Sequence, residues 1–140
     1  MVVFPNAKIN IGLFITGKRP NGYHNLVSCF YPVPWHDVLE VVESDHLAFK
    51  SSGIPIPGNA EDNLCLKAYQ LLTADFDLPP VNIHLLKKIP IGAGLGGGSA
   101  DGTFMLKACN QMFDLNMEDN QLEKYASKLG SDCPFFVRNQ

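Results

Sequence analysis

The chain lacks the features that mark several large classes of protein. It contains no apolar run of the length that a membrane-spanning helix needs. Its 11 Lys and Arg residues are outnumbered by 14 Asp and Glu residues, and the net charge of −3 provides no basic surface for nucleic acid. The N-terminus has no signal-peptide pattern, and no repeat or low-complexity tract is present. We therefore expect a cytoplasmic protein without membrane or nucleic-acid partners, and its oligomeric state stays open.

Paired cysteines are also missing. The four cysteines are scattered, with no C-x-x-C spacing, which argues against a metal site or a disulfide framework. We expect reduced, buried thiols, as is typical of the cytoplasm. They are Cys29, Cys65, Cys109 and Cys133. With 140 residues, of which 46% are hydrophobic, the chain is long and apolar enough for one packed domain.

A glycine-rich run at residues 90–101 is the most informative feature that is present. It has the sequence P-I-G-A-G-L-G-G-G-S-A-D, in which five of twelve residues are glycine. Such a backbone can turn tightly and bring several N–H groups to one point. Ser99 and Asp101 predict a helix start directly afterwards, and a helix N-terminus favours anions. The run therefore predicts a phosphate-binding loop, and the alternative is a flexible linker.

Two common phosphate-loop patterns fit this run poorly. The Walker A pattern requires Lys and then Ser or Thr after its last glycine, whereas Ser99 and Ala100 follow Gly98. The dinucleotide pattern G-x-G-x-x-G matches on paper at residues 92–97. It needs a strand that runs unbroken into the glycines, and Pro90 interrupts that approach.

Periodicity predicts an α+β domain, with helices on one face of a mixed sheet. Apolar residues alternate with others over residues 7–16, which places Ile9, Ile11, Leu13 and Ile15 on one face of a strand. Lys8 and Asn10 then share the other face, roughly 7 Å apart. Further strands are expected at residues 26–35, 37–42, 47–50, 81–85 and 134–137, and helices at residues 63–75, 99–113 and 119–129.

Several polar residues have an ordinary interpretation when each is taken alone. Lys8 suits a sheet edge as a gatekeeper, and Asp132 suits a turn after a helix. Asn63 suits a helix cap, and Lys87 suits a solvated strand end. Tyr23 and His24 suit the flank of a turn at residues 19–22.

Three ordered motifs change this interpretation. They are the opening F-P-N-A-K-I-N-I-G-L-F-I-T-G-K-R-P-N-G-Y-H, the glycine run, and L-G-S-D-C-P-F-F-V near the C-terminus. Together they resemble the GHMP kinases, named for galacto-, homoserine, mevalonate and phosphomevalonate kinases. The triple glycine and the G-Y-H pair are most similar to the branch that phosphorylates 4-diphosphocytidyl-2-C-methyl-D-erythritol. The resemblance implies the ribosomal protein S5 domain 2-like fold.

The resemblance implies a small-molecule kinase that uses ATP and Mg²⁺. It assigns Asp132 as the base that accepts the proton of the attacking hydroxyl and Lys8 as a cation beside the γ-phosphate. Asn10 would contact the polyol, Tyr23 would stack on cytosine, and His24 would bind the polar edge of that base.

The nucleotide site implied by the resemblance is larger. It comprises Asn63, Lys87, Pro90, Gly92, Gly94, Leu95, Gly96, Gly97, Gly98 and Ser99. Ser99 is also the candidate Mg²⁺ contact, because Ala100 stands where the family often has a second serine. Gly102 and Thr103 replace alanines that are usual in the family, and the glycine should weaken the helix by roughly 1 kcal/mol.

Family members are longer than this chain and have a second domain. The expectation is therefore that residues 1–140 form a GHMP kinase N-terminal domain, apparently truncated, which is at most poorly active alone. Two alternatives stay open. One is a GHMP kinase of the homoserine or mevalonate type, and the other is a non-catalytic nucleotide-binding module.

Overall fold

The computed structural model describes residues 1–18, 22 and 24–140. Four strands form one mixed sheet in the order β1-β4-β6-β5, where β1 is Val2–Val3, β4 is Val38–Glu43, β5 is Ala48–Gly53 and β6 is Val81–Lys87. β4 is antiparallel to β1 and β6, whereas β5 is parallel to β6. The short β1 was not predicted from the sequence.

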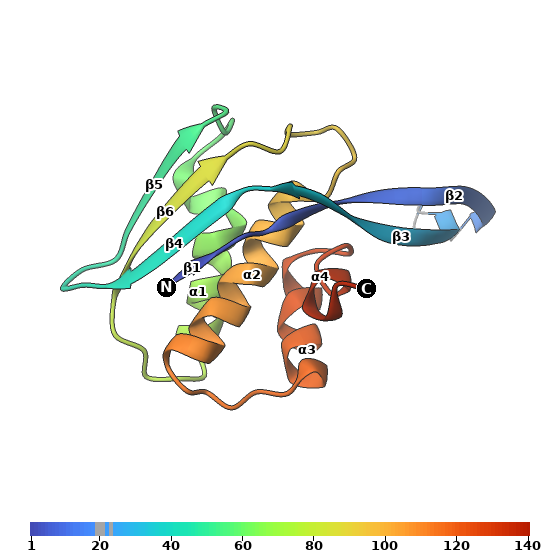
Figure 1. Cartoon of the computed structure of the whole chain (residues 1–140). Helices are drawn as coiled ribbons and strands as arrows, with labels where there is room; N and C mark the ends of the chain where they lie inside the picture. Colours follow the sequence, from blue (N-terminus) through green and yellow to red (C-terminus); the bar gives the residue numbers. More distant parts are fainter. Residues whose placement is uncertain (19–21, 23) are drawn as a thin grey trace.

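Two helices cover one face of this sheet (Figure 1). They are α1 (Leu64–Thr73), which follows the single 3₁₀ turn η1 (Ala60–Asp62), and α2 (Gly97–Met112). β6 alternates buried and less buried residues along its whole length, so only one of its faces enters the core. The predicted α+β architecture, with a mixed sheet and helices on one face, is confirmed.

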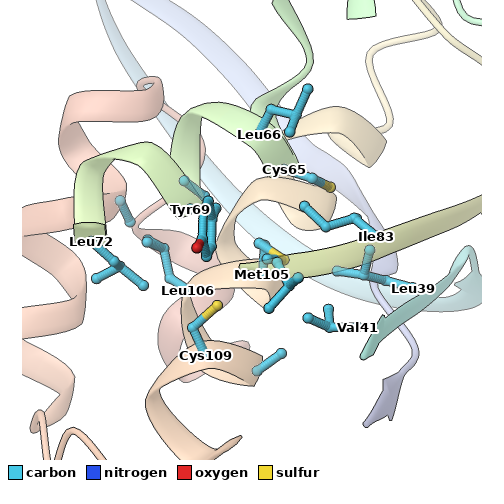
Figure 2. Packing of buried hydrophobic residues seen from close by; sticks show 14 of the residues in the cluster. Leu39, Val41, Cys65, Leu66, Tyr69, Leu72, Ile83, Met105, Leu106 and Cys109 are labelled. Atoms are coloured by element: carbon cyan, nitrogen blue, oxygen red, sulfur yellow. The ribbon is translucent and has the colours of Figure 1, made fainter. Parts of the chain in front are cut away.

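The hydrophobic core lies between the sheet and these helices. Figure 2 shows Met105 of α2 between Ile83 of the sheet and Leu72 of α1, and all three belong to one buried cluster. Cys65, Cys109 and Cys133 are buried free thiols, as expected. Cys29 is exposed, and the prediction that it is buried is wrong. Cys29 belongs to a ribbon that stands away from the core.

That ribbon is a separate two-stranded sheet of β2 (Asn6–Lys18) and β3 (His24–His36), which extends from the body of the domain (Figure 1). The strand predicted at residues 7–16 exists, but its apolar face is not buried. Ile9, Ile11 and Ile15 are 42%, 55% and 66% exposed. β2 has only one neighbouring strand, and irregular pairing near Gly12 (φ +70°) breaks the alternation.

The segment after the third predicted helix is also different from the expectation. α3 spans Asp119–Leu129, and a turn then leads into the short helix α4 (Phe135–Arg138). The strand predicted at residues 134–137 is therefore wrong. A run of four apolar residues does not distinguish a strand from a helical turn, and Pro134 fits the first turn of a helix. Phe136 is fully buried in this helical arrangement.

Candidate active site

The glycine-rich run forms the wall of a cavity of about 350 Å³. Gly92, Gly94 and Gly96 all have φ between +69° and +74°, a backbone conformation that side chains with a Cβ rarely adopt. The structure brings together all the residues that were predicted to bind nucleotide. The cavity is lined by Asn63, Lys87, Pro90, Gly92, Gly94, Leu95, Gly96, Gly97, Gly98 and Ser99, and also by Ile56, Leu64, Ile91, Ala93 and Asp101.

The first turn of α2 belongs to this wall. The helix begins at Gly97 and not at the predicted Ser99, because left-handed Gly96 lets the chain turn into the helix two residues earlier. Ser99 is therefore a first-turn residue and not the cap. Helix geometry leaves the N–H groups of this turn without partners inside the helix, and they carry partial positive charge. Such a helix start suits a phosphate group.

Lys8 and Asp132 meet beside the glycine run. Lys8 Nζ lies 3.3 Å from Asp132 Oδ2 and 3.4 Å from Asn10 Oδ1. The Lys8 ammonium also lies 4.2 Å from the ring centroid of Phe30. The Lys8 side chain is 4% exposed and that of Asp132 is 34% exposed. A buried cation thus holds a carboxylate that solvent or a ligand can still reach.

Backbone contacts tie this pair to the glycine run. The Lys8 N–H group donates to the Leu95 carbonyl at 2.9 Å, and this bond joins β2 to the middle of the run. A Cβ atom at Gly96 would lie 3.0 Å from Lys8 Cγ and from Phe136 Cζ. The glycine therefore permits the Lys8 stem and α4 to approach the run closely. The result is one site in which a cation, a carboxylate and the glycine-rich cavity wall adjoin.

Three buried charged groups adjoin the cavity, and two of them, Lys87 and Asp101, help to line it. Lys87 Nζ contacts Asp37 Oδ2 at 2.5 Å and Asp101 Oδ2 at 2.7 Å, and all three residues are at most 3% exposed. Lys87 is thus not a solvated strand end. Burial raises the pKa of Asp101 to about 7, although the attraction of Lys87 opposes this rise. The two carboxylates outweigh burial at Lys87 and raise its pKa.

Sequence reasoning did not identify Asp37 as part of the site. Its Oδ1 atom accepts the backbone N–H groups of Lys88 and Ile89, at 2.5 and 2.8 Å. The only available signal was a charged residue between two apolar strands, and such a residue is usually part of a loop. Asp101 was expected merely to favour the helix start, but it lies in the second turn and is buried.

Gly102 and Thr103, which replace the alanines usual in the family, have a packing role in α2. A Cβ atom at Gly102 would lie 2.9 Å from Leu64 Cβ, so the glycine lets α1 and α2 approach closely. The Thr103 hydroxyl lies 2.9 Å from the carbonyl oxygens of Ser99 and Cys133. It therefore links the first turn of α2 to the residue that follows Asp132.

Of the three residues predicted to bind the substrate, Asn10 is the one whose side-chain contacts the structure describes. Asn10 contacts Lys8, as described above, and Ser28 Oγ donates to Asn10 Oδ1 at 3.1 Å. Tyr23 lies outside the described residues. The backbone of His24 begins β3 opposite Lys18, at the end of the ribbon.

Comparison with known proteins identifies the family. Residues 63–140, more than half of the chain, match the family model described as "GHMP kinases N terminal domain". The chain belongs to the GHMP kinase family.

Individual GHMP kinases agree with this membership. The chain is 52% identical over 139 residues to a protein of Cytophaga hutchinsonii and 57% identical over 143 residues to one of Bacteroides thetaiotaomicron. Both relatives are named 4-diphosphocytidyl-2-C-methyl-D-erythritol kinase. The matches cover 99% of this chain and 52% of each relative. The chain thus spans about half the length of the curated relatives it matches.

Solved GHMP kinase structures have the same fold. A crystal structure of 4-(cytidine 5'-diphospho)-2C-methyl-D-erythritol kinase matches with a TM-score of 0.83 and 34% identity, over 100% of this chain and 50% of that one. Streptococcus pneumoniae phosphomevalonate kinase matches with a TM-score of 0.69 and 17% identity, over 100% of this chain and 46% of that one, which shows the shared fold alone. The family and fold inferred from the three sequence motifs are confirmed.

Proposed function

We propose that this chain supplies the nucleotide site and the proton acceptor of a kinase. The reaction transfers the γ-phosphoryl group of ATP to the 2-hydroxyl group of 4-diphosphocytidyl-2-C-methyl-D-erythritol. The observation that carries the proposal is the Lys8–Asp132 ion pair, which adjoins the glycine run through the bond from Lys8 to Leu95. The printed names of relatives at 52% and 57% identity support the choice of acceptor.

The phosphate chain of ATP fits the cavity wall. The glycine run and the first turn of α2 offer backbone donors that no side chain crowds, since a Cβ atom at Gly92, Gly94 or Gly98 would meet nothing within 4 Å. Phosphoryl transfer depends mainly on positioning and on charge stabilisation. Asn63 and Lys87 also line the cavity, and the proposal places the nucleotide between them and the glycine run.

Asp132 is the proposed base. As the substrate oxygen attacks the γ-phosphorus, a new O–P bond forms, the bond to ADP breaks, and the hydroxyl proton passes to the Asp132 carboxylate. Lys8 pairs with this carboxylate and offsets the negative charge that develops on the transferred group. Asn10, which contacts Lys8, lies close enough to this pair to orient the acceptor hydroxyl.

Mg²⁺ fits the donor chemistry of the cavity. No cluster of three or more metal-binding side chains occurs in the described part of the chain. A kinase magnesium ion needs only one or two protein oxygens, because phosphates and water supply the other ligands. The Ser99 hydroxyl lines the cavity and would provide such an oxygen. When bound, the ion neutralises phosphate charge.

The cytidine end of the substrate is assigned to Tyr23 and His24, by stacking and by a hydrogen bond, as the family resemblance implies. The proposal also assigns residues 1–140 to the N-terminal domain of such a kinase, with further substrate contacts from a second domain. We place the reaction in the cytoplasm, because the four cysteines are free. No helix in the described ranges is long and apolar enough to cross a membrane.

A chimeric enzyme tests the proposal. The chain would be joined to the part of the Bacteroides thetaiotaomicron relative that the alignment leaves uncovered, and the relative itself would be the positive control. Mass spectrometry would follow phosphate transfer from Mg-ATP to 4-diphosphocytidyl-2-C-methyl-D-erythritol, homoserine and mevalonate. We expect transfer to the first acceptor alone. Asp132→Asn should lower the rate by about 10²–10⁴-fold and leave ATP affinity within about twofold.

The outcomes separate the candidate functions. Preferred transfer to homoserine or mevalonate would replace the proposed acceptor. A folded chimera that binds Mg-ATP but phosphorylates none of the three would favour a nucleotide-binding module. Full activity of Asp132→Asn would remove Asp132 from the role of base.

A further inference from the structure

The two ends of the glycine run are connected below the cavity by buried charges. Asp37 Oδ1 accepts the N–H groups of Lys88 and Ile89, which immediately precede the run. Asp101 lies in the second turn of α2, at the end of the run, and contacts Lys87 Nζ. Lys87 Nζ also contacts Asp37 Oδ2, so one ammonium group joins the start of the run to its end.

This connection lies directly beneath the phosphate-binding wall. A Cβ atom at Gly97, the first residue of α2, would lie 2.8 Å from Lys87 Nζ and 2.9 Å from Ile89 Cγ2. Any sideways shift of the run against β6 would therefore change the contacts of the ammonium group. Lys87 is 3% exposed, and both of its carboxylate partners are equally inaccessible.

The network is costly as a purely structural device. Two carboxylates share one buried cation, and Asp101 Oδ1 has no hydrogen-bond partner among the described residues. Apolar residues of similar volume would stabilise the positions of Lys87 and Asp101 at least as well, whereas Asp37 also pairs two backbone N–H groups. The presence of this network beside the cavity therefore points to a requirement of the site.

We propose that Asp37, Lys87 and Asp101 are positioning residues that hold the glycine run in the conformation that binds the phosphates of ATP. Lys87 lines the cavity, but two carboxylates already occupy its ammonium group, so Lys87 acts on the nucleotide through the run. The inference rests on the proposed function. It adds that these three residues determine the affinity for ATP and do not affect binding of the acceptor.

Single Asp→Asn variants can test the inference, because they leave the buried charges balanced. Asp37→Asn and Asp101→Asn each leave one cation and one carboxylate, so the buried charge is balanced and folding should be retained. The side-chain amide oxygen that Asp37→Asn introduces can still accept the N–H groups of Lys88 and Ile89, whereas Asp37→Ala removes that acceptor. Asp75→Asn is the matched control, because Asp75 accepts a hydrogen bond from Tyr125 and does not line the cavity.

Calorimetric titration of the chain with Mg-ATP gives the primary readout, and thermal unfolding without nucleotide gives the stability of each variant. We expect Asp37→Ala to raise the Kd for ATP by about tenfold or more. Asp37→Asn keeps the backbone acceptor but loses the ion pair with Lys87, so it should restore only part of the affinity. Asp101→Asn should raise the Kd by about threefold. The melting temperature of Asp101→Asn should be equal to or above that of the unaltered chain. Loss of structure would not produce weaker ATP binding together with an unchanged or higher melting temperature.

The chimera adds a second readout, in which KM for ATP should rise in Asp37→Ala while KM for the acceptor stays constant. Wild-type ATP affinity in folded Asp37→Ala, or tighter binding in Asp101→Asn, would overturn the inference and leave the proposed function standing. If Asp37→Ala does not fold, Asp101→Asn decides alone. Failure of the unaltered chain and of the chimera to bind Mg-ATP would overturn the proposed function and this inference with it.

Discussion

Gly96 and Gly98 lie two residues apart in the same wall, yet alanine should affect them in opposite directions. Gly96 has φ +69°, and its new methyl group would lie 3.0 Å from Lys8 Cγ and Phe136 Cζ. Gly98 lies inside the first turn of α2, and a methyl group there would meet nothing within 4 Å. The pair therefore separates a structural requirement for glycine from a functional one.

The expected cost of Gly96→Ala is the sum of two terms. The left-handed backbone adds about 1–2 kcal/mol, and the crowded methyl group adds about 1–3 kcal/mol. The Lys8 stem cannot move aside freely, because its ammonium group is held by Asp132 and Phe30. A loss of about 2–5 kcal/mol should lower the melting temperature by about 7–17 °C in a domain of this size.

Gly98→Ala should instead stabilise the chain by about 0.5–1 kcal/mol, because alanine is the better helix former. Its methyl group would project into the space where a phosphate meets the backbone donors of α2. We expect the Kd for Mg-ATP to rise by about tenfold, since roughly one hydrogen bond to a charged group is lost. Thermal unfolding followed by circular dichroism and calorimetric titration measure the two effects separately.

Two results would refute this reasoning. A melting temperature of Gly96→Ala equal to that of the unaltered chain would mean that the close approach of Lys8 and Phe136 to the run is wrong. A Gly98→Ala variant that is stable and binds Mg-ATP with unchanged affinity would mean that phosphate does not lie against the first turn of α2.

Three further predictions concern other parts of the site. Asn63→Ala should lower the free energy of unfolding in urea by about 1 kcal/mol, because Asn63 Oδ1 accepts the Cys65 N–H group at the start of α1. Asp101→Asn should remove a decrease in unfolding free energy between about pH 4 and pH 7, because the folded pKa of about 7 exceeds the ordinary 3.8. Phe30→Leu should lower the transfer rate of the chimera about two- to fivefold, because the ring 4.2 Å from the Lys8 ammonium is lost.

Each of these predictions has its own control. Asn63→Ser keeps a capping oxygen and should retain most of the stability, so equal losses in both variants would contradict the capping role. For Asp101, protonation favours the folded state, so its contribution to stability is complete below about pH 4 and lost above about pH 7. If the unfolding free energy of Asp101→Asn changes with pH in the same way as that of the unaltered chain, a group other than Asp101 causes the change. Phe30→Tyr keeps the aromatic face and should preserve the transfer rate.

Local chemistry made much of the site predictable from the sequence. Closely spaced glycines followed by a helix start favour a tight turn whose N–H groups converge, and the structure places this run in the wall of a cavity. The hydrophobic periodicity of residues 63–75 and 99–113 predicted α1 and α2 to within a few residues, because a helix buries residues at a fixed spacing. The start of α2 was placed two residues too late, since glycine at position 96 also permits a left-handed cap.

Local chemistry was insufficient where burial decided the outcome. Periodicity placed Ile9, Ile11 and Ile15 on one face of a strand, but whether that face is covered depends on a neighbouring layer that the strand does not specify. The strand predicted at residues 134–137 was wrong for the same reason. The short helix α4 buries Phe136 there, and the local sequence does not specify the layer that covers it.

By itself, the sequence determined the residue types of the site, the glycine wall and the family to which the chain belongs. Only the tertiary structure decided that Lys8 and Asp132, from opposite ends of the chain, form an ion pair, and that Asp37 reaches Lys87 beneath the run. The physical reason is that hydrogen bonds and ion pairs depend on distances of a few ångströms. Between residues distant in sequence, packing of the whole domain sets those distances.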